Sequence, residues 1–99
     1  MSTGSIYANY INMLNQADRL DELAGALRSK AESASQNIEA DISTGWTGDA
    51  ANECRRKKDR LAGNALSHAG QLERSAALLR SAAREYYRLE TMGQILFGE

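Results

Sequence analysis

The sequence predicts an all-α protein that folds as an antiparallel two-helix hairpin. The chain of 99 residues contains no proline and no valine and is rich in Ala, Leu, Glu, Arg and Ser, so helix formers dominate and typical strand formers are scarce. In both halves, apolar residues recur at alternating spacings of three and four, which is the helical period. A chain of this length forms one domain, so we expect residues 1–99 to make a single helical hairpin.

The first helix is expected over about residues 6–43. Ser5 is a suitable N-cap, and Gly45 is a suitable residue to end the helix. The apolar positions with this period are Ile6, Tyr10, Met13, Ala17, Leu20, Ala24, Leu27, Ala31, Ala34 and Ile38.

A short turn over residues 45–48 is expected next, followed by a second helix over about residues 49–91. Thr47 or Asp49 can accept hydrogen bonds from the first free N–H groups, and Asp49 also suits the positive end of the helix dipole. Gly93 is expected to end or fray this helix and to leave residues 92–99 as a tail. The second row of periodic positions holds Cys54, Leu61, Ala65, His68, Leu72, Ser75, Leu79, Ala82, Tyr86 and Leu89.

Two long helices joined by so short a turn must fold back on each other. A turn centred between Trp46 and Thr47 places side chains of similar size at equal height. These pairs are Tyr7 with Tyr86, Leu14 with Leu79, Ala17 with Ala76, Ala24 with Ala69, Leu27 with Leu66, and Ala31 with Ala62. A lone hairpin leaves part of each apolar stripe in water, so we expect a second hairpin, identical or related, to complete a four-helix bundle.

Composition and chemistry argue against several functional classes. The net charge of −1 gives no overall attraction to nucleic acid or membrane. The first residues lack the basic region and unbroken apolar stretch of a signal peptide, and no segment is apolar enough for a membrane anchor. Cys54 and His68 lie about 21 Å apart along one helix at 1.5 Å per residue, so they cannot form a catalytic pair. We expect no enzyme activity, no metal and no cofactor.

Trp46 is the only tryptophan, and it lies in the predicted turn between Gly45 and Gly48. A turn needs glycine and a cap but no indole. The ring therefore either covers the end of the helical bundle or takes part in recognition.

These residues give the chain a resemblance to the WXG family of early-secretory-antigen-like proteins. Trp46-Thr47-Gly48 stands near the midpoint of a helical chain of about a hundred residues, and the second helix carries a tyrosine and an acid four residues apart, Tyr86 and Glu90. The resemblance implies a non-enzymatic protein that a type VII secretion system exports as a folded dimer, without a cleaved signal peptide. It also implies a motor ATPase as partner, and an adaptor role for a larger toxin is consistent with it.

Under this hypothesis, Trp46, Tyr86 and Glu90 form one export signal. Trp46 lies at the turn and Tyr86 near the open end, so they cannot meet within one hairpin. In an antiparallel dimer, the turn of one hairpin lies beside the open end of the other. The composite signal would then exist only in the assembled dimer.

Two further segments are candidate docking sites. The tail residues Ile95, Leu96 and Phe97 either fold onto the bundle or serve as an apolar docking peptide for the export motor. The basic run, made up of Arg55, Arg56, Lys57, Lys58 and Arg60, is either a solvated helix surface or a surface for an acidic partner. An alternative function is therefore an intracellular helical module that binds nucleic acid or an acidic protein through residues 55–60. The negative total charge and the lack of interleaved aromatic residues argue against nucleic acid.

Overall fold

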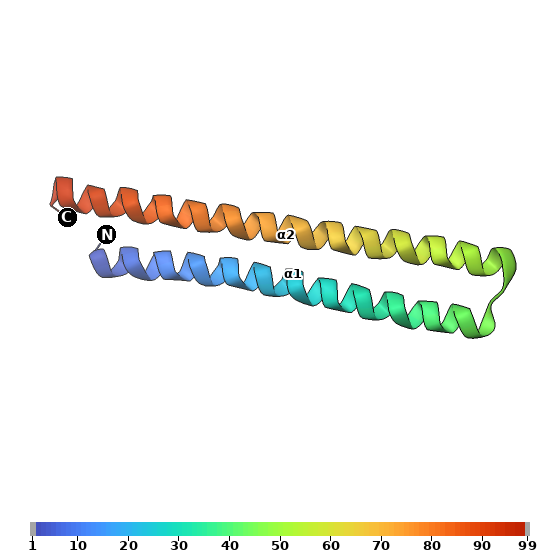
Figure 1. Cartoon of the computed structure of the whole chain (residues 1–99). Coiled ribbons are helices and arrows are strands. Elements are labelled where there is room, and N and C mark those ends of the chain that lie inside the picture. The colour runs from blue at the N-terminus through green and yellow to red at the C-terminus, as the bar shows by residue number, and fades with distance from the viewer. Residues whose placement is uncertain (1, 99) are drawn as a thin grey trace. The chain divides into compact units, whose positions relative to one another are not determined.

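The computed structural model describes residues 2–98 and confirms the helical hairpin. Helix α1 spans Thr3–Gly45 and helix α2 spans Gly48–Phe97. By their contacts the residues divide into two compact units. Unit 1 combines the start of α1, up to Glu22, with the part of α2 from Leu72 onward, and unit 2 is Leu23–Gln71, which includes the turn. In each unit a segment of α1 runs antiparallel to a segment of α2 (Figure 1).

The first helix begins earlier than predicted because Ser2, and not Ser5, caps it. The Ser2 hydroxyl accepts a hydrogen bond from the Ser5 backbone N–H at 3.1 Å, and the Ser2 carbonyl accepts one from the Ile6 N–H at 3.0 Å. These bonds satisfy N–H groups that a helix start leaves without partners. The expectation of Ser5 as the cap was therefore wrong by about one turn.

The turn between the helices is very short. The backbone N–H of Trp46 donates to the carbonyl of Ile42 at 2.9 Å, which carries the helical bonding pattern of α1 to the tryptophan. Gly48 then takes a φ of 65°, a left-handed conformation that glycine adopts without the steric cost that a Cβ brings. This conformation reverses the chain and starts α2, whose first turn contains Asp49.

The second helix does not end near residue 91, so the expected tail over residues 92–99 was wrong. Helix α2 continues through Gly93 to Phe97, and Gly98, with a φ of 69°, ends it. The Gly98 N–H donates to the Gln94 carbonyl at 3.1 Å, as in an αL cap. A single interior glycine costs only about 1 kcal/mol relative to alanine, which is too little to end a helix that the flanking residues favour.

Alanine dominates the buried core of both units. The buried apolar residues among those described are Ile6, Ala17, Ala76 and Ala83 in unit 1, and Ala24, Ile42, Ala51 and Ala69 in unit 2. The four alanines predicted to pair as Ala17 with Ala76 and Ala24 with Ala69 are thus all buried. Small side chains allow two helices to approach closely, but they bury little apolar area. Larger residues such as Leu23, Leu61 and Leu66 stay exposed.

Candidate functional site

The indole of Trp46 lies at the surface of unit 2, where it is 50% exposed. It borders a shallow hollow that is lined further along α2 by Ala50, Glu53, Cys54 and Lys57. The ring therefore rests partly on the first turns of α2 and keeps its other side in solvent. Within unit 2 it does not act as a buried plug, and an exposed indole beside a glycine turn has the geometry of a contact residue.

The pair Tyr86 and Glu90 lies on α2 in unit 1. Tyr86 is half-buried, and its hydroxyl accepts a hydrogen bond from the Asn9 side-chain amide at 3.1 Å. Glu90 is exposed one turn further along the same helix. The two residues thus differ in character, because the tyrosine is tied to α1 while the carboxylate faces solvent.

Aromatic rings pack beside Tyr86 and fix this part of unit 1. The ring centroids of Tyr10 and Tyr87 are 4.8 Å apart, and those of Tyr7 and Tyr87 are 6.3 Å apart at 73°, an edge-to-face arrangement. Such ring pairs add about 0.5–1.5 kcal/mol beyond the area that they bury. Tyr7 was predicted to lie level with Tyr86, and its ring contact with α2 is to the neighbouring Tyr87.

The basic run of α2 is largely paired with carboxylates. Glu39 of α1 accepts hydrogen bonds from Arg55 and from Lys58, each at 3.0 Å, and both bonds join the two helices of unit 2. These bonds, first that from Lys58 and then that from Arg55, lower the pKa of Glu39. The bond to Glu39 raises the pKa of Lys58, whose side chain is only 12% exposed.

Two further bases of the run, Arg56 and Lys57, also meet an acid. Arg56 forms an ion pair with Glu53 at 2.7 Å, and Lys57 approaches the same carboxylate at 4.0 Å. The hydrogen bond from Arg56 lowers the pKa of Glu53. The run therefore contributes structure as well as charge, and the positive field it offers to an acidic partner is smaller than its five cations suggest.

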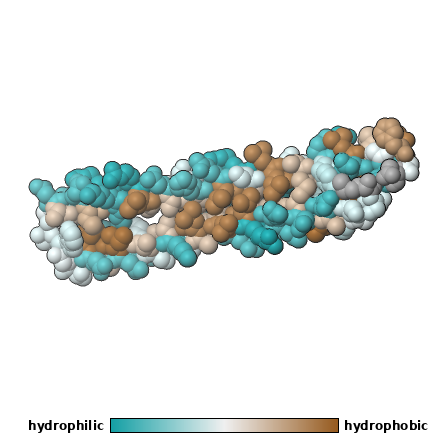
Figure 2. Space-filling model, turned by 180° about the vertical axis from the view of Figure 1, so that it is seen from behind, coloured by the Kyte–Doolittle hydropathy of each residue, from teal (hydrophilic) through white to brown (hydrophobic). Residues whose placement is uncertain are grey.

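Unit 2 also carries an apolar groove between its helices that the sequence patterns did not identify. Ala31, Ala34 and Ile38 of α1 line it together with Leu61, Ala62 and Ala65 of α2, and Ser35 and Lys58 are the polar residues of its lining. The groove forms because alanines line it where larger residues would fill the space. Figure 2 shows apolar surface of this kind, in brown, beside polar surface in teal.

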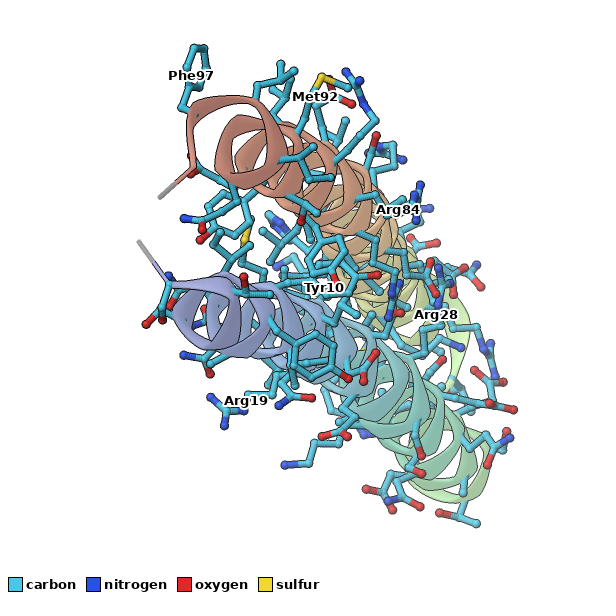
Figure 3. All side chains as sticks on the ribbon, turned by 90° about the vertical axis from the view of Figure 1, so that its left-hand side faces the viewer. Tyr10, Arg19, Arg28, Arg84, Met92 and Phe97 are labelled. Carbon is cyan, nitrogen blue, oxygen red and sulfur yellow. The ribbon has the colours of Figure 1, made fainter. Side chains whose placement is uncertain are left out.

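The predicted tail residues belong to the last turns of α2. Ile95, Leu96 and Phe97 are 77%, 66% and 81% exposed, and Figure 3 shows Phe97 pointing away from α1. They are therefore available for contact as part of a helix, whereas a tail beyond the helix end was expected.

A reactive cysteine, a metal-binding group or a membrane-spanning helix within residues 2–98 would indicate other functions. The half-buried Cys54 is a free cysteine, and no group of three or more His, Cys, Asp and Glu side chains is placed to hold a metal. No helix in this range is long and apolar enough to cross a membrane. Comparisons with protein-family models, with curated proteins and with solved structures gave no match.

Proposed function

We propose that this chain is a small non-enzymatic protein of the WXG type, which a type VII secretion system exports as a folded dimer or as the co-export adaptor of a larger toxin. The observation that carries the proposal is the half-exposed Trp46 at a glycine turn between two long helices. An indole that the hairpin does not bury is available to a partner or to the export apparatus.

The second support is the unfinished core. Six of the eight buried apolar residues among those described are alanines, whereas large residues such as Leu61 and Leu66 lie in solvent. A partner hairpin laid on the groove of unit 2 would cover Ile38 and Leu61 and add the apolar burial that the alanines do not supply. The partner proposed here is a second copy or a related helical hairpin.

The third support is the contrast between Tyr86, which is bonded to α1, and Glu90, which is exposed on the same helix. Tyr86 is held by Asn9, so its position is fixed relative to α1, and Glu90 presents a charge to solvent close by. Together with Trp46 they form the proposed export signal, with the motor ATPase as its reader. The exposed residues Ile95, Leu96 and Phe97 at the end of α2 are a further docking element for that ATPase.

The alternative function, binding of nucleic acid or of an acidic protein through residues 55–60, has weaker support. Arg55 and Lys58 are engaged by Glu39, and Arg56 is engaged by Glu53. A phosphate backbone would have to displace these carboxylates. A gel-retardation assay at low and moderate salt tests this function, because phosphate-driven binding weakens steeply as salt rises.

The test of the export proposal is secretion from the native host. Trp46→Ala, Tyr86→Ala and Glu90→Ala should each reduce export while circular dichroism and sedimentation show an unchanged fold and association state. Gln71→Ala, a change at an exposed position of α2, is the control and should be exported normally. Normal export of all three folded variants would reject the signal and leave Trp46 as a surface residue of the turn.

A further inference from the structure

The part of α2 in unit 1 carries a row of regularly spaced exposed positions, separate from the buried Ala76 and Ala83. It includes Ala82 and Leu89, which were predicted to belong to the periodic row of this helix. Its members follow one another at spacings of four, three, four, three and four residues: Leu78, Ala82, Glu85, Leu89, Met92 and Leu96. We refer to these six positions as the outer seam. The alternating spacing of four and three in the outer seam is that of the a and d positions in a coiled coil.

The outer seam faces away from α1. Leu78, Leu89 and Leu96 are 71%, 52% and 66% exposed, whereas Ala76 and Ala83 of the same helix are fully buried. Figure 3 shows Met92 on the side of α2 that is remote from α1. The described residues of unit 1 therefore leave the leucines of the seam largely in solvent.

The same line of the helix changes character abruptly at Leu78. Counted back from Leu78 by four and three residues in turn, which breaks the alternation once because two steps of four meet at Leu78, the line passes through exposed polar residues: Arg74, Gln71, Ser67, Asn64, Arg60, Lys57 and Glu53. Single exposed leucines are common on protein surfaces. A row that is polar up to residue 74 and then apolar at five of six positions indicates a contact surface confined to the end of α2.

The composition of the seam favours a second copy of the chain as its partner. In an antiparallel coiled coil, each a position faces a d position of the other helix. One register satisfies this rule over the whole seam, with Leu78 facing Leu96 of the second copy, Ala82 facing Met92, and Glu85 facing Leu89. Because Ala faces Met, the largest flexible side chain meets the smallest one.

The charges at the centre of the seam fit the same register. Arg88 donates to Glu85 at 2.6 Å, and both side chains are 56% exposed. A two-fold axis near residue 87 brings the Glu85 carboxylate of each copy beside the Arg88 guanidinium of the other. Four charges of alternating sign then surround the axis, and each glutamate lies within reach of two arginines.

We propose that two copies of this chain associate through the outer seam as an antiparallel helix pair about a two-fold axis near residue 87. This contact goes beyond the proposed export function. It is also distinct from the groove of unit 2 that we propose for the partner hairpin, because the seam lies in unit 1. If both contacts form, the assembly is a dimer of dimers.

The test exchanges the two central charges one at a time. Glu85→Arg places four arginines around the axis, and Arg88→Glu places four glutamates there. For each variant alone, the association constant of the seam contact should fall at least tenfold, as measured by sedimentation velocity over a concentration series. An equimolar mixture of the two variants should recover it, because every arginine then faces a glutamate of the other copy.

The mixture distinguishes a contact between two copies from an effect of the Glu85–Arg88 bond within one helix. Both variants lack the Glu85–Arg88 bond inside the helix, so mixing cannot restore an internal contribution. The matched control is the pair Glu53→Arg and Arg56→Glu, which alters the same kind of ion pair, at 2.7 Å, in the polar stretch of α2. The control variants should associate as the unchanged chain does, both singly and mixed.

The measured oligomer size shows whether the seam contact is lost, whether or not the export proposal is correct. A loss of seam pairing reduces a tetramer to a dimer if the bundle contact exists, and a dimer to a monomer if it does not. Unchanged association of both charge variants, or no recovery on mixing, would overturn the proposal.

A second measurement fixes the register. In a Cys54→Ser background, chains with Ala82→Cys mixed with chains carrying Met92→Cys should form a disulfide between copies under mild oxidation, and each alone should form far less. Equal crosslinking in the single variants, or crosslinking of neither mixture nor singles, would overturn the antiparallel register.

Discussion

The Lys58 ammonium lies 3.0 Å from the Glu39 carboxylate and ties α2 to α1 within unit 2. The residues are nineteen apart in sequence, and the lysine side chain is 12% exposed and helps to line an apolar groove. This ion pair and the Arg55–Glu39 pair join the two helices of unit 2 through polar contacts, in addition to the packing of the alanine core.

The first prediction concerns acid stability. The pKa of Glu39 is lowered below its ordinary value of 4.5 by hydrogen bonds from Lys58 and then Arg55, so its contribution to stability is present above that value and is lost as the pH falls through the lowered pKa. Glu39→Gln should therefore lower Tm at pH 7, and the two proteins should converge in Tm at acidic pH. Thermal unfolding from pH 7 to pH 2 measures this. A constant Tm difference over the whole range would contradict it.

The second prediction concerns the two glycines near the end of α2. Gly93 lies within the helix, and a Cβ there would meet no atom within 4 Å, so Gly93→Ala should stabilise the protein by about 0.5–1 kcal/mol. Gly98 has a φ of 69°, which strains any residue with a Cβ, so Gly98→Ala should leave stability unchanged or lower and should fray the last turn. Urea unfolding and helicity by circular dichroism check both. A destabilising Gly93→Ala would place the helix end near residue 91 after all.

The third prediction concerns the alanine core. Ala76 is fully buried between the helices of unit 1, so Ala76→Leu should overpack it and cost about 1–3 kcal/mol. The neighbouring Ala77 is exposed, and Ala77→Leu is the matched control. We expect the control to shift the urea midpoint by far less. Equal effects at the two positions would show that the helices do not approach through their alanines.

The periodicity of three and four was enough to predict the hairpin, because a continuous helical pattern broken once by Gly45 and Gly48 leaves few other folds. The helix ends were harder to predict. Ser2 and Ser5 are both plausible caps, and Gly93 and Gly98 are both plausible stops. Only the backbone geometry, a hydrogen bond to Ser2 and a positive φ at Gly98, decides between them.

The position of Trp46 in the candidate site could be predicted from the sequence, but the contacts of the neighbouring residues were harder to predict. Trp46 was identified because a turn does not need an indole, and the structure finds it half-exposed. The predicted register places Glu39 level with Cys54 and so close to Arg55, but the pairing of the basic run with Glu39 was not predicted because only apolar positions were compared across the helices. The outer seam was overlooked for a different reason. Ending the helix near residue 91 removed Met92 and Leu96 from the row, and Ala82 and Leu89 were assigned to the predicted row that also holds Leu79 and Tyr86.

The alanine core leaves the hairpin incomplete, and the proposed second hairpin completes it. The most direct measurement is thermal unfolding, followed by circular dichroism over a hundredfold range of protein concentration, with the oligomeric state determined by sedimentation equilibrium. We predict that Tm rises with concentration and that the chain is at least dimeric at micromolar concentration, because association with the folded state stabilises it by mass action. A monomer that unfolds cooperatively at a Tm independent of concentration would contradict the claim.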